Sequence, residues 1–348
     1  MLKRVLIAYT SWPPIIDYLK RAFERRGIEA RGCYADENTW FDRFVIHRVN
    51  KLAHNFRIIP KSRNLFEGHP KSHMNYRSSR LRQAIRAYDP DLVFHIRGLG
   101  FRRSAFDGAR RTFAWWVESD ERVQEALGEA PWFDHFFFIN ASSVEVARRA
   151  GFDHASYLPH AVDAAVFRSL PEVTRDLDFC FVGLWSEKRQ RFLEAALELT
   201  GNGAVYGPKW YRKTLSDPRF RRIVKGRHIA GEALVRLYNR AKIVFNITAW
   251  GAAGGASRSG MTMRLFEVPA TGAFLLTDYS TDMEGVLAPG KHVAVFSDLE
   301  DFRRKVRHYL DDASERERIA AQGAEEVRTR HSYDRVVDRI VSVYEGRA

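Results

Sequence analysis

The chain has 348 residues, of which 45% are hydrophobic and 28% charged, and 56 Lys and Arg stand against 43 Asp and Glu. These values are typical of a globular protein long enough for two domains, and they exclude a low-complexity chain. No apolar run approaches the roughly 20 residues that a membrane-spanning helix needs, and the start MLKRVLIAYT lacks the long apolar region of a signal peptide. Cys33 and Cys180 are far apart and have no companions for a metal site, so we expect a reduced, cytoplasmic protein.

Residues 1–160 alternate between strand and helix patterns. The strand RVLIAYT is followed by the helix IIDYLKRAFERRG, whose apolar residues fall on one face and which ends at Gly27. Further strands are predicted at 29–34 and over DLVFHIRG, TFAWWVESD and HFFFIN, and further helices over SSRLRQAIRAYDP and ASSVEVARRAGF. This rhythm predicts an N-terminal Rossmann-like domain with a doubly wound parallel sheet.

A basic insert at about 40–86 interrupts this first domain. Residues 43–86 hold eleven Lys or Arg against one acid, Glu67, and so carry most of the net charge of +13. We expect this segment to face an anionic partner. Nucleic-acid binding is one alternative, but the aromatic–basic interleaving of known nucleic-acid modules is missing, so we predict no nucleic-acid partner.

Within the insert, residues 40–56 have apolar side chains at helical spacing, with Arg43, Arg48 and Lys51 between them. Such a stripe fits a core-facing helix. It also fits a basic amphipathic helix in a membrane interface, which would bring the protein to the inner face of the membrane as a peripheral protein.

A second series of strands and helices follows YLPHAVDAAVF, which is typical of a crossover between domains. Its strand patterns are DFCFVGLW, AVYG, IVFNIT, AFLLTD and VAVF, and its helix patterns are RQRFLEAALEL, GEALVRLYNRA and RLFEVPA. Helices over 299–310, 315–330 and 333–344 close the chain. We therefore predict a C-terminal Rossmann-like domain over 161–348, with the last helix (about 332–346) packing back on the N-terminal domain.

The most informative stretch is IVFNITAWGAAGGASRSGMTMRLFEVPATGAFLLTD. A glycine-rich loop leads from a strand into a helix that we expect to open near 259–261, an arrangement that favours an anion. Arg258 and Arg264 flank this helix start and suit a diphosphate. Glu267 lies one turn further on and suits the hydroxyls of a ribose. A nucleotide is therefore the predicted ligand.

The part R-L-F-E-V-P-A-T-G-A-F-L-L-T-D resembles the donor site of GT-B glycosyltransferases of the group-1 and CgeB-like type. The resemblance implies an α/β fold of two Rossmann-like domains facing a central cleft. It assigns Glu267, which matches the second glutamate of the E-x7-E motif of group-1 enzymes, to the donor ribose, and it places Ser259 where those enzymes have the first glutamate. It further implies Arg189 and its neighbour Lys188 as phosphate-binding cations, and Tyr206 or Trp210, in Y-G-P-K-W, as the contact to the nucleobase.

Three side chains of the first domain are candidates for the acceptor side. His95 ends DLVFHIRG, and Glu118 and Asp120 end TFAWWVESD. Because ligands bind beyond the carboxyl ends of parallel strands, we expect these groups to face the substrate. Glu118, and after it Asp120, would deprotonate an acceptor hydroxyl or steady the charge on the sugar. Alternatively, these acids only cap the next helix.

The predicted function is sugar transfer from a nucleotide-diphosphate sugar, in the first instance a UDP-sugar, by an enzyme of hexosyltransferase type. The acceptor would be a protein or an anionic or lipid-linked glycan. We predict no cofactor and no metal, since the D-x-D pairs at 89–91 and 176–178 precede strands and are interpreted as structural. A sugar-nucleotide 2-epimerase shares this architecture and is the alternative enzyme.

Overall fold

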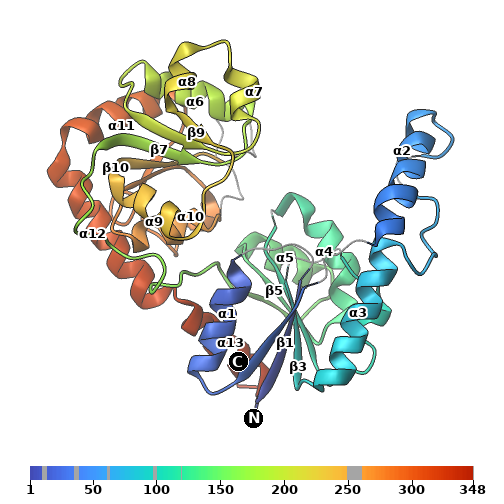
Figure 1. Cartoon of the computed structure of the whole chain (residues 1–348). Coiled ribbons are helices and arrows are strands. Elements are labelled where there is room, and N and C mark those ends of the chain that lie inside the picture. The colour runs from blue at the N-terminus through green and yellow to red at the C-terminus, as the bar shows by residue number, and fades with distance from the viewer. Residues whose placement is uncertain are drawn as a thin grey trace. The chain divides into compact units, whose positions relative to one another are not determined.

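A computed structural model describes residues 1–9, 14–34, 39–60, 63–96, 100–118, 120–248 and 261–347 (Figure 1). The chain divides into two compact units, one made of Met1–Leu158 with Val337–Ala348 and the other of Pro159–Val336. Each unit contains a six-stranded parallel sheet. The predicted α/β class with two Rossmann-like domains is thereby confirmed.

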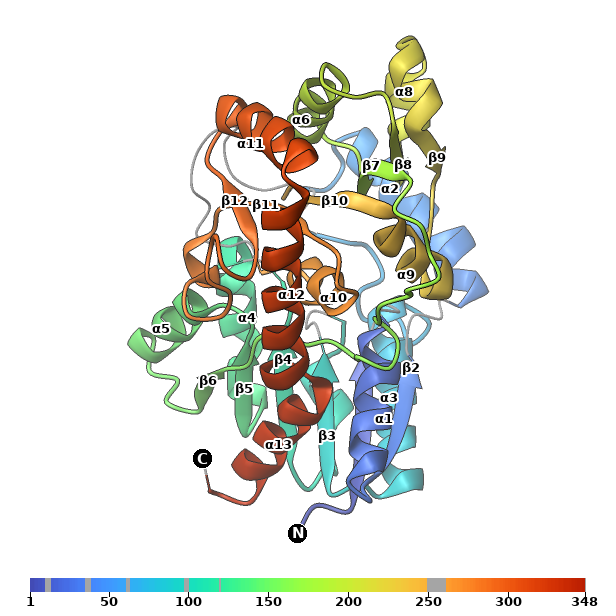
Figure 2. The same cartoon turned by 90° about the vertical axis from the view of Figure 1, so that its left-hand side faces the viewer.

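The sheet of the first unit has the strand order β2-β1-β3-β4-β5-β6, and Figure 2 shows β2 to β6 side by side in this order. Its strands are β1 (Arg4–Tyr9), β2 (Glu29–Tyr34), β3 (Leu92–Ile96), β4 (Thr112–Trp116), β5 (His135–Phe138) and β6 (Ala155–Tyr157). Its helices are α1 (Ile15–Arg25), α2 (His47–Asn55), α3 (His73–Tyr88), α4 (Val123–Glu129), α5 (Ala141–Arg149) and most of α13 (Tyr333–Tyr344).

Successive residues of a strand point to opposite faces of the sheet, and in this unit both faces are covered by helices. On one face Ala114 and Trp116 of β4 join a core with side chains of α3, α4 and α5. On the other face Phe113 of β4 meets Tyr344 of α13, with ring centroids 6.4 Å apart. Strands buried on both sides explain the unbroken apolar runs in the sequence.

The sheet of the second unit has the order β12-β11-β10-β7-β8-β9. Its strands are β7 (Leu177–Val182), β8 (Gly203–Tyr206), β9 (Val224–Gly226), β10 (Ala241–Asn246), β11 (Leu275–Asp278) and β12 (Ala294–Phe296). Its helices are α6 (Glu187–Leu197), α7 (Trp210–Thr214), α8 (Pro218–Ile223), α9 (Gly231–Arg240), α10 (Arg264–Ala270), α11 (Leu299–Asp311) and α12 (Ala313–Arg330). Helices α6 and α11 lie on one face of β7 and β10, and α9 and α10 lie on the other (Figure 1).

The order of this second sheet determines where a ligand can bind. Counted from its own first strand, β7, it is the order of a Rossmann sheet, and the direction of strand addition reverses between β7 and β10. The loops that leave the carboxyl ends of β7 and β10 therefore diverge to opposite faces. In open α/β sheets this switch point is the usual binding edge.

The basic insert forms an arm on the first unit, which we define as residues 39–60 and 63–72. It contains a π-helix (Asp42–Ile46) that continues into α2, which stands beyond the end of α3 and away from the sheet (Figure 1). None of the six apolar residues of the predicted stripe, at positions 41, 44, 45, 49, 52 and 56, is buried. The interpretation as a core-facing stripe is therefore wrong, because an arm one helix thick has little interior to receive it. Among the described residues, no helix is both long and apolar enough to cross a bilayer.

Candidate functional site

Lys188 lies at the switch point of the second unit, at the start of α6. Its Nζ is 3.1 Å from Oδ2 of Asp278, which ends β11, and 3.4 Å from Oγ1 of Thr248, which follows β10. Asp278 Oδ2 also accepts a hydrogen bond from the backbone N–H of Thr248 at 3.0 Å. One ion pair thus ties together the loops that follow three strands and places a cation at the binding edge.

Arg189 is almost completely buried, and its guanidinium binds backbone. Nε donates to the carbonyl of Ile247 and Nη1 to the carbonyl of Leu184, both at 2.7 Å. Burial, together with the charge of Arg264, lowers the pKa of Arg189 to about 10, and the charge of Asp278 opposes this effect. The side chain is still charged at neutral pH, and it joins the loops after β7 and β10. Its described contacts therefore fix the shape of the loops around the predicted phosphate site.

The loops after β7 and β8 approach each other without room for side chains. Gly207 has a φ of 153°, and a Cβ there would lie 1.9 Å from the carbonyl oxygen of Gly183. Trp210 Nε1 donates to that same oxygen at 2.7 Å, and the indole is fully buried against Phe181. Trp210 therefore cannot stack on a nucleobase. Of the two predicted aromatic contacts, Tyr206 remains, partly exposed at the end of β8.

Arg264 and Glu267 both lie on α10, beside the end of β10. Arg264 Nη1 donates to Oδ1 of Asn246 at 3.1 Å, and Asn246 Nδ2 donates to Thr277 Oγ1 at 2.9 Å, so residues on β10 and β11 hold the arginine in place. Helix α10 begins at Arg264, later than predicted, because Thr262 and Met263 still belong to a turn. The predicted Arg258 and Ser259, with the glycine-rich loop, lie outside the described residues.

Glu267 is a buried carboxyl group, with only 7% of the residue exposed. Burial raises its pKa to about 7, and the charge of Arg264 works against this rise. No hydrogen bond to the carboxyl group is found among the described residues. An ionised carboxylate in such a place is costly unless a partner binds it. A perturbed, unsatisfied acid next to an arginine at a sheet edge therefore indicates a ligand site.

On the first unit, the structure corrects the expectation for His95. The side chain is 1% exposed and packs against Phe101, Phe106 and Phe133. Its Nδ1 is 3.2 Å from the carbonyl oxygen of Ala8, and burial lowers its pKa to about 4. His95 is thus a neutral core residue without access to an acceptor hydroxyl.

Glu118 and Asp120 follow β4 at the carboxyl edge of the first sheet. Glu118 Oε2 is 3.6 Å from Arg122 Nη1, and its side chain is 18% exposed. Asp120 begins a 3-10 turn that leads into α4. The N-cap position of α4 is Arg122, so neither acid occupies it.

The two D-x-D pairs bind protein groups. Arg110 pairs with Asp89 at 2.5 Å and Asp91 at 3.2 Å. Asp176 pairs with Arg240 at 2.6 Å, and Asp178 with Lys242 at 2.8 Å. The one described group with the spacing of metal ligands is His308, Asp312 and Glu315, where Asp312 also caps α12.

The sequence is similar to one protein family and to one named protein. Residues 188–342 match the family model described as glycosyl transferase-like. The spore protein CgeB of Bacillus subtilis is 21% identical over 243 residues, which cover 67% of this chain and 74% of that protein.

Solved structures share the fold over nearly the whole chain. Sucrose-phosphate synthase from Thermosynechococcus elongatus superposes with a TM-score of 0.70 at 11% identity, covering 99% of this chain and 98% of that one. HepE of Anabaena, solved with UDP and glucose, gives 0.65 at 9% identity, covering 98% and 100%. A UDP-N-acetylglucosamine 2-epimerase-like protein from Listeria monocytogenes gives 0.60 at 14% identity, covering 99% and 97%.

The fold is therefore the GT-B architecture. The family match and the relative confirm the resemblance predicted from the sequence: the chain is similar to glycosyl transferase-like proteins and to CgeB.

Proposed function

We propose that this protein transfers a sugar from a nucleotide-diphosphate sugar to a glycan acceptor, and that the second unit binds the donor. The observation that carries the proposal is the buried carboxyl group of Glu267, which has no hydrogen-bond partner among the described residues and lies beside Arg264 at the carboxyl edge of the second sheet. Lys188 lies at the switch point of the same sheet. A carboxylate and two cations at one edge suit the ribose hydroxyls and the diphosphate of one nucleotide.

Each side chain then has a chemical role. Glu267 would accept hydrogen bonds from the ribose hydroxyls, while Arg264 and Lys188 would bind the diphosphate oxygens. Arg189 would hold the loops after β7 and β10 in the shape that binds phosphate, and Tyr206 would contact the base. Arg258 and Ser259 remain candidates for the same site.

The transfer step would use the cations in place of a metal ion. An acceptor oxygen attacks the anomeric carbon, the bond from that carbon to the diphosphate oxygen breaks, and the hydroxyl proton passes to Glu118, with Asp120 as the second candidate. The negative charge that develops on the leaving nucleoside diphosphate is stabilised by Arg264 and Lys188. Exclusion of water from the bound donor would suppress donor hydrolysis.

UDP-sugars are the first donors to test, since HepE, which has the same fold, was solved with UDP and glucose. For the acceptor, the basic arm favours an anionic or lipid-linked glycan. Such an acceptor would bring the enzyme to the cytoplasmic face of a membrane.

A thermal-shift screen with UDP, GDP, ADP, dTDP and CMP and their sugars tests the donor site. One nucleoside diphosphate should raise the melting temperature by several degrees at saturating concentration. The variant Arg264→Ala should abolish this shift, whereas Arg307→Ala, an exposed arginine of α11, should retain it. A full shift in Arg264→Ala, or no shift with any nucleotide, would refute the assignment.

The alternative activity, sugar-nucleotide 2-epimerisation, is suggested by the fold shared with the epimerase-like protein. It would require acids that remove and return a proton at the sugar carbon next to the anomeric centre. Incubation with UDP-N-acetylglucosamine in deuterated water, followed by NMR of the sugar, separates the two activities. Exchange at that carbon would indicate epimerisation, and its absence together with release of UDP in the presence of an acceptor would indicate transfer.

A further inference from the structure

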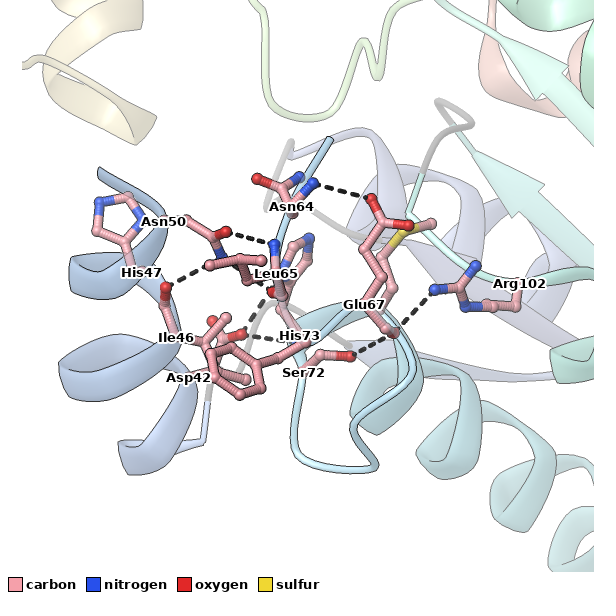
Figure 3. A pocket seen from close by; sticks show the side chains of 12 residues that line it. Asp42, Ile46, His47, Asn50, Asn64, Leu65, Glu67, Ser72, His73 and Arg102 are labelled. Atoms are coloured by element: carbon pink, nitrogen blue, oxygen red, sulfur yellow. Dashed lines mark hydrogen bonds and ion pairs between the residues drawn. The ribbon is translucent and has the colours of Figure 1, made fainter. Parts of the chain in front are cut away.

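The arm places its polar side chains inward. A cavity of about 230 Å³ lies between the π-helix, α2, the 63–72 loop and the start of α3 (Figure 3). Asp42 and Asn50 at this cavity are 6% and 7% exposed. Asp42 Oδ1 accepts the backbone N–H of His73 at 2.9 Å, and Asn50 Oδ1 accepts that of Leu65 at 2.6 Å. These polar groups are thus used to fold the arm.

A second set of contacts fastens the loop of the arm to the first unit. Arg102 Nη2 donates to the carbonyl of Glu67 at 3.0 Å (Figure 3). Its Nε donates to Asn75 Oδ1 at 2.8 Å. Asn50 Nδ2 additionally donates to the carbonyl of Ile46 at 3.0 Å. Hydrogen bonds therefore connect the polar groups on the inner face of the arm, and they hold the arm in a defined shape.

The outer face carries the apolar side chains. Trp40, Phe56 and Ile58 are 70%, 73% and 72% exposed. Of the twelve large hydrophobic side chains exposed among the described residues, seven lie in the arm: Trp40, Phe44, Leu52, Phe56, Ile58, Leu65 and Phe66. Leu65 and Phe66 also line the cavity, so the outer face is assigned to the other five. Ile46 and Ala53 are buried beside Asp42 and Asn50, whereas the large apolar side chains of the outer face stay exposed, which water disfavours. An exposed apolar patch of this density marks a surface that meets an apolar partner.

Cations share this outer face with the aromatic rings. Between residues 43 and 66 the sequence has six Lys or Arg and no acid. The rings of Trp40 and Phe44 lie 5.8 Å apart, and the guanidinium carbons of Arg43 and Arg48 are 5.8 and 5.5 Å from the Phe44 ring centroid. A partner must therefore be anionic and apolar at the same time.

We propose that the arm binds the surface of an anionic lipid bilayer, with Trp40, Phe44, Leu52 and Phe56 in the boundary between headgroups and acyl chains. The bilayer interface offers negative charge at the level of the cations and hydrocarbon just beneath it, which is the combination that this face requires. A second copy of the chain is a poor occupant, because each copy carries a net charge of +13 and the two arms would repel. The binding is shallow, since no described helix can span the membrane.

Membrane binding by the arm would be independent of sugar transfer, because it involves neither Glu118 nor the donor site. If the protein does glycosylate an acceptor, the arm would keep the first unit next to lipid-linked molecules. The two activities can therefore be lost separately by mutation.

Co-sedimentation with vesicles of phosphatidylcholine containing 30% phosphatidylglycerol tests the proposal. We expect the full-length protein to bind these vesicles, to bind pure phosphatidylcholine vesicles at least tenfold more weakly, and to dissociate as salt rises. The double variant Trp40→Ser/Phe56→Ser should lose binding by tenfold or more. The triple variant Arg43→Gln/Arg48→Gln/Lys51→Gln should lose roughly fivefold per cation, because each is worth about 1 kcal/mol at an anionic surface.

Matched controls come from the second unit. Tyr211→Ser removes a side chain that is 63% exposed outside the arm, and Arg221→Gln/Arg222→Gln removes exposed cations of α8; neither should change vesicle binding. All variants change exposed side chains, so their melting temperatures and their nucleotide-induced shifts should match the wild type. Conversely, Glu267→Ala should lose the nucleotide shift and keep vesicle binding.

Absence of binding to anionic vesicles, or equal loss in the control variants, would overturn the proposal. Binding to a soluble anionic polysaccharide without any binding to vesicles would also overturn it, because the aromatic face would then have no role. Concentration-dependent self-association that disappears in Trp40→Ser/Phe56→Ser, without vesicle binding, would assign the face to a second copy instead.

Discussion

Replacing Glu267 with glutamine should make the protein more stable at alkaline pH and at the same time less able to bind nucleotide. The wild-type carboxyl group is buried, and its pKa rises from 4.5 to about 7. For an acid whose pKa is raised by folding, the folded state holds the proton more tightly than the unfolded state. The free energy of unfolding therefore falls as the pH rises from about 4.5 to about 7, and it stays lower above that range.

The size of the effect follows from the same values. A rise from 4.5 to about 7 corresponds to roughly 3 kcal/mol of destabilisation once the carboxyl group is ionised. Glutamine has the shape of the protonated acid and no charge to bury. For a unit of this size we expect Glu267→Gln to melt about 5–10 °C above the wild type at pH 8 and only a few degrees above it at pH 5.

Differential scanning calorimetry at the two pH values measures this difference, and UDP or the preferred nucleotide is then added to each sample. The wild type should gain stability from the nucleotide, whereas Glu267→Gln should gain little, because an amide is a weaker acceptor for ribose hydroxyls. The exposed Glu300→Gln on α11 is the control and should change neither result. An equal pH dependence in wild type and Glu267→Gln would refute the burial argument. A full nucleotide response in the variant would refute the ribose contact.

Three further changes test other parts of the structure. Glu118→Gln should lower the transfer rate by about 100-fold or more while the nucleotide-induced melting shift persists; unchanged initial rates would exclude Glu118 as the base. In calorimetric titrations, Lys188→Ala should weaken the binding of UDP by about tenfold and the binding of uridine hardly at all. Equal weakening of both affinities would argue against a phosphate contact. Gly207→Ala should lower the free energy of unfolding by about 2 kcal/mol or more, because its Cβ would meet a backbone oxygen at 1.9 Å. The control Gly201→Ala has open space and should be nearly neutral, so equal effects in denaturant titrations would contradict the close approach.

Much of the architecture could be predicted from the sequence because strand and helix patterns are local. The buried strands β7, β10 and β11 appear as continuous apolar runs, and amphipathic helices such as α9 and α11 appear as one-sided stripes. The motif that ends at Asp278 likewise carried the resemblance to the GT-B class. The short helices α4, α7 and α8 were missed, since five to seven residues are too few to establish a period.

The site was harder to predict, because the role of a side chain depends on neighbours that are distant in sequence. His95 and Glu118 both lie at or near the end of a strand of one sheet, but His95 faces an aromatic core and Glu118 does not. Trp210 was a candidate for the contact to the nucleobase, but its indole is buried and stabilises a loop of the second unit instead. The ion pair between Lys188 and Asp278 joins residues 90 positions apart, so no local sequence pattern predicts it.

The arm shows the same division. Its charge and its helical spacing are properties of the sequence, and they alone indicated a helix with an anionic partner. Which way the helix faces was decided by the tertiary structure. Asp42 accepts a hydrogen bond from His73 at the start of α3 and Asn50 accepts one from Leu65 of the loop, so both are buried, whereas Trp40 and Phe56 are exposed. Periodicity records that a helix has two faces, but only the groups packed against it determine which face is buried, because burial is a property of the surroundings.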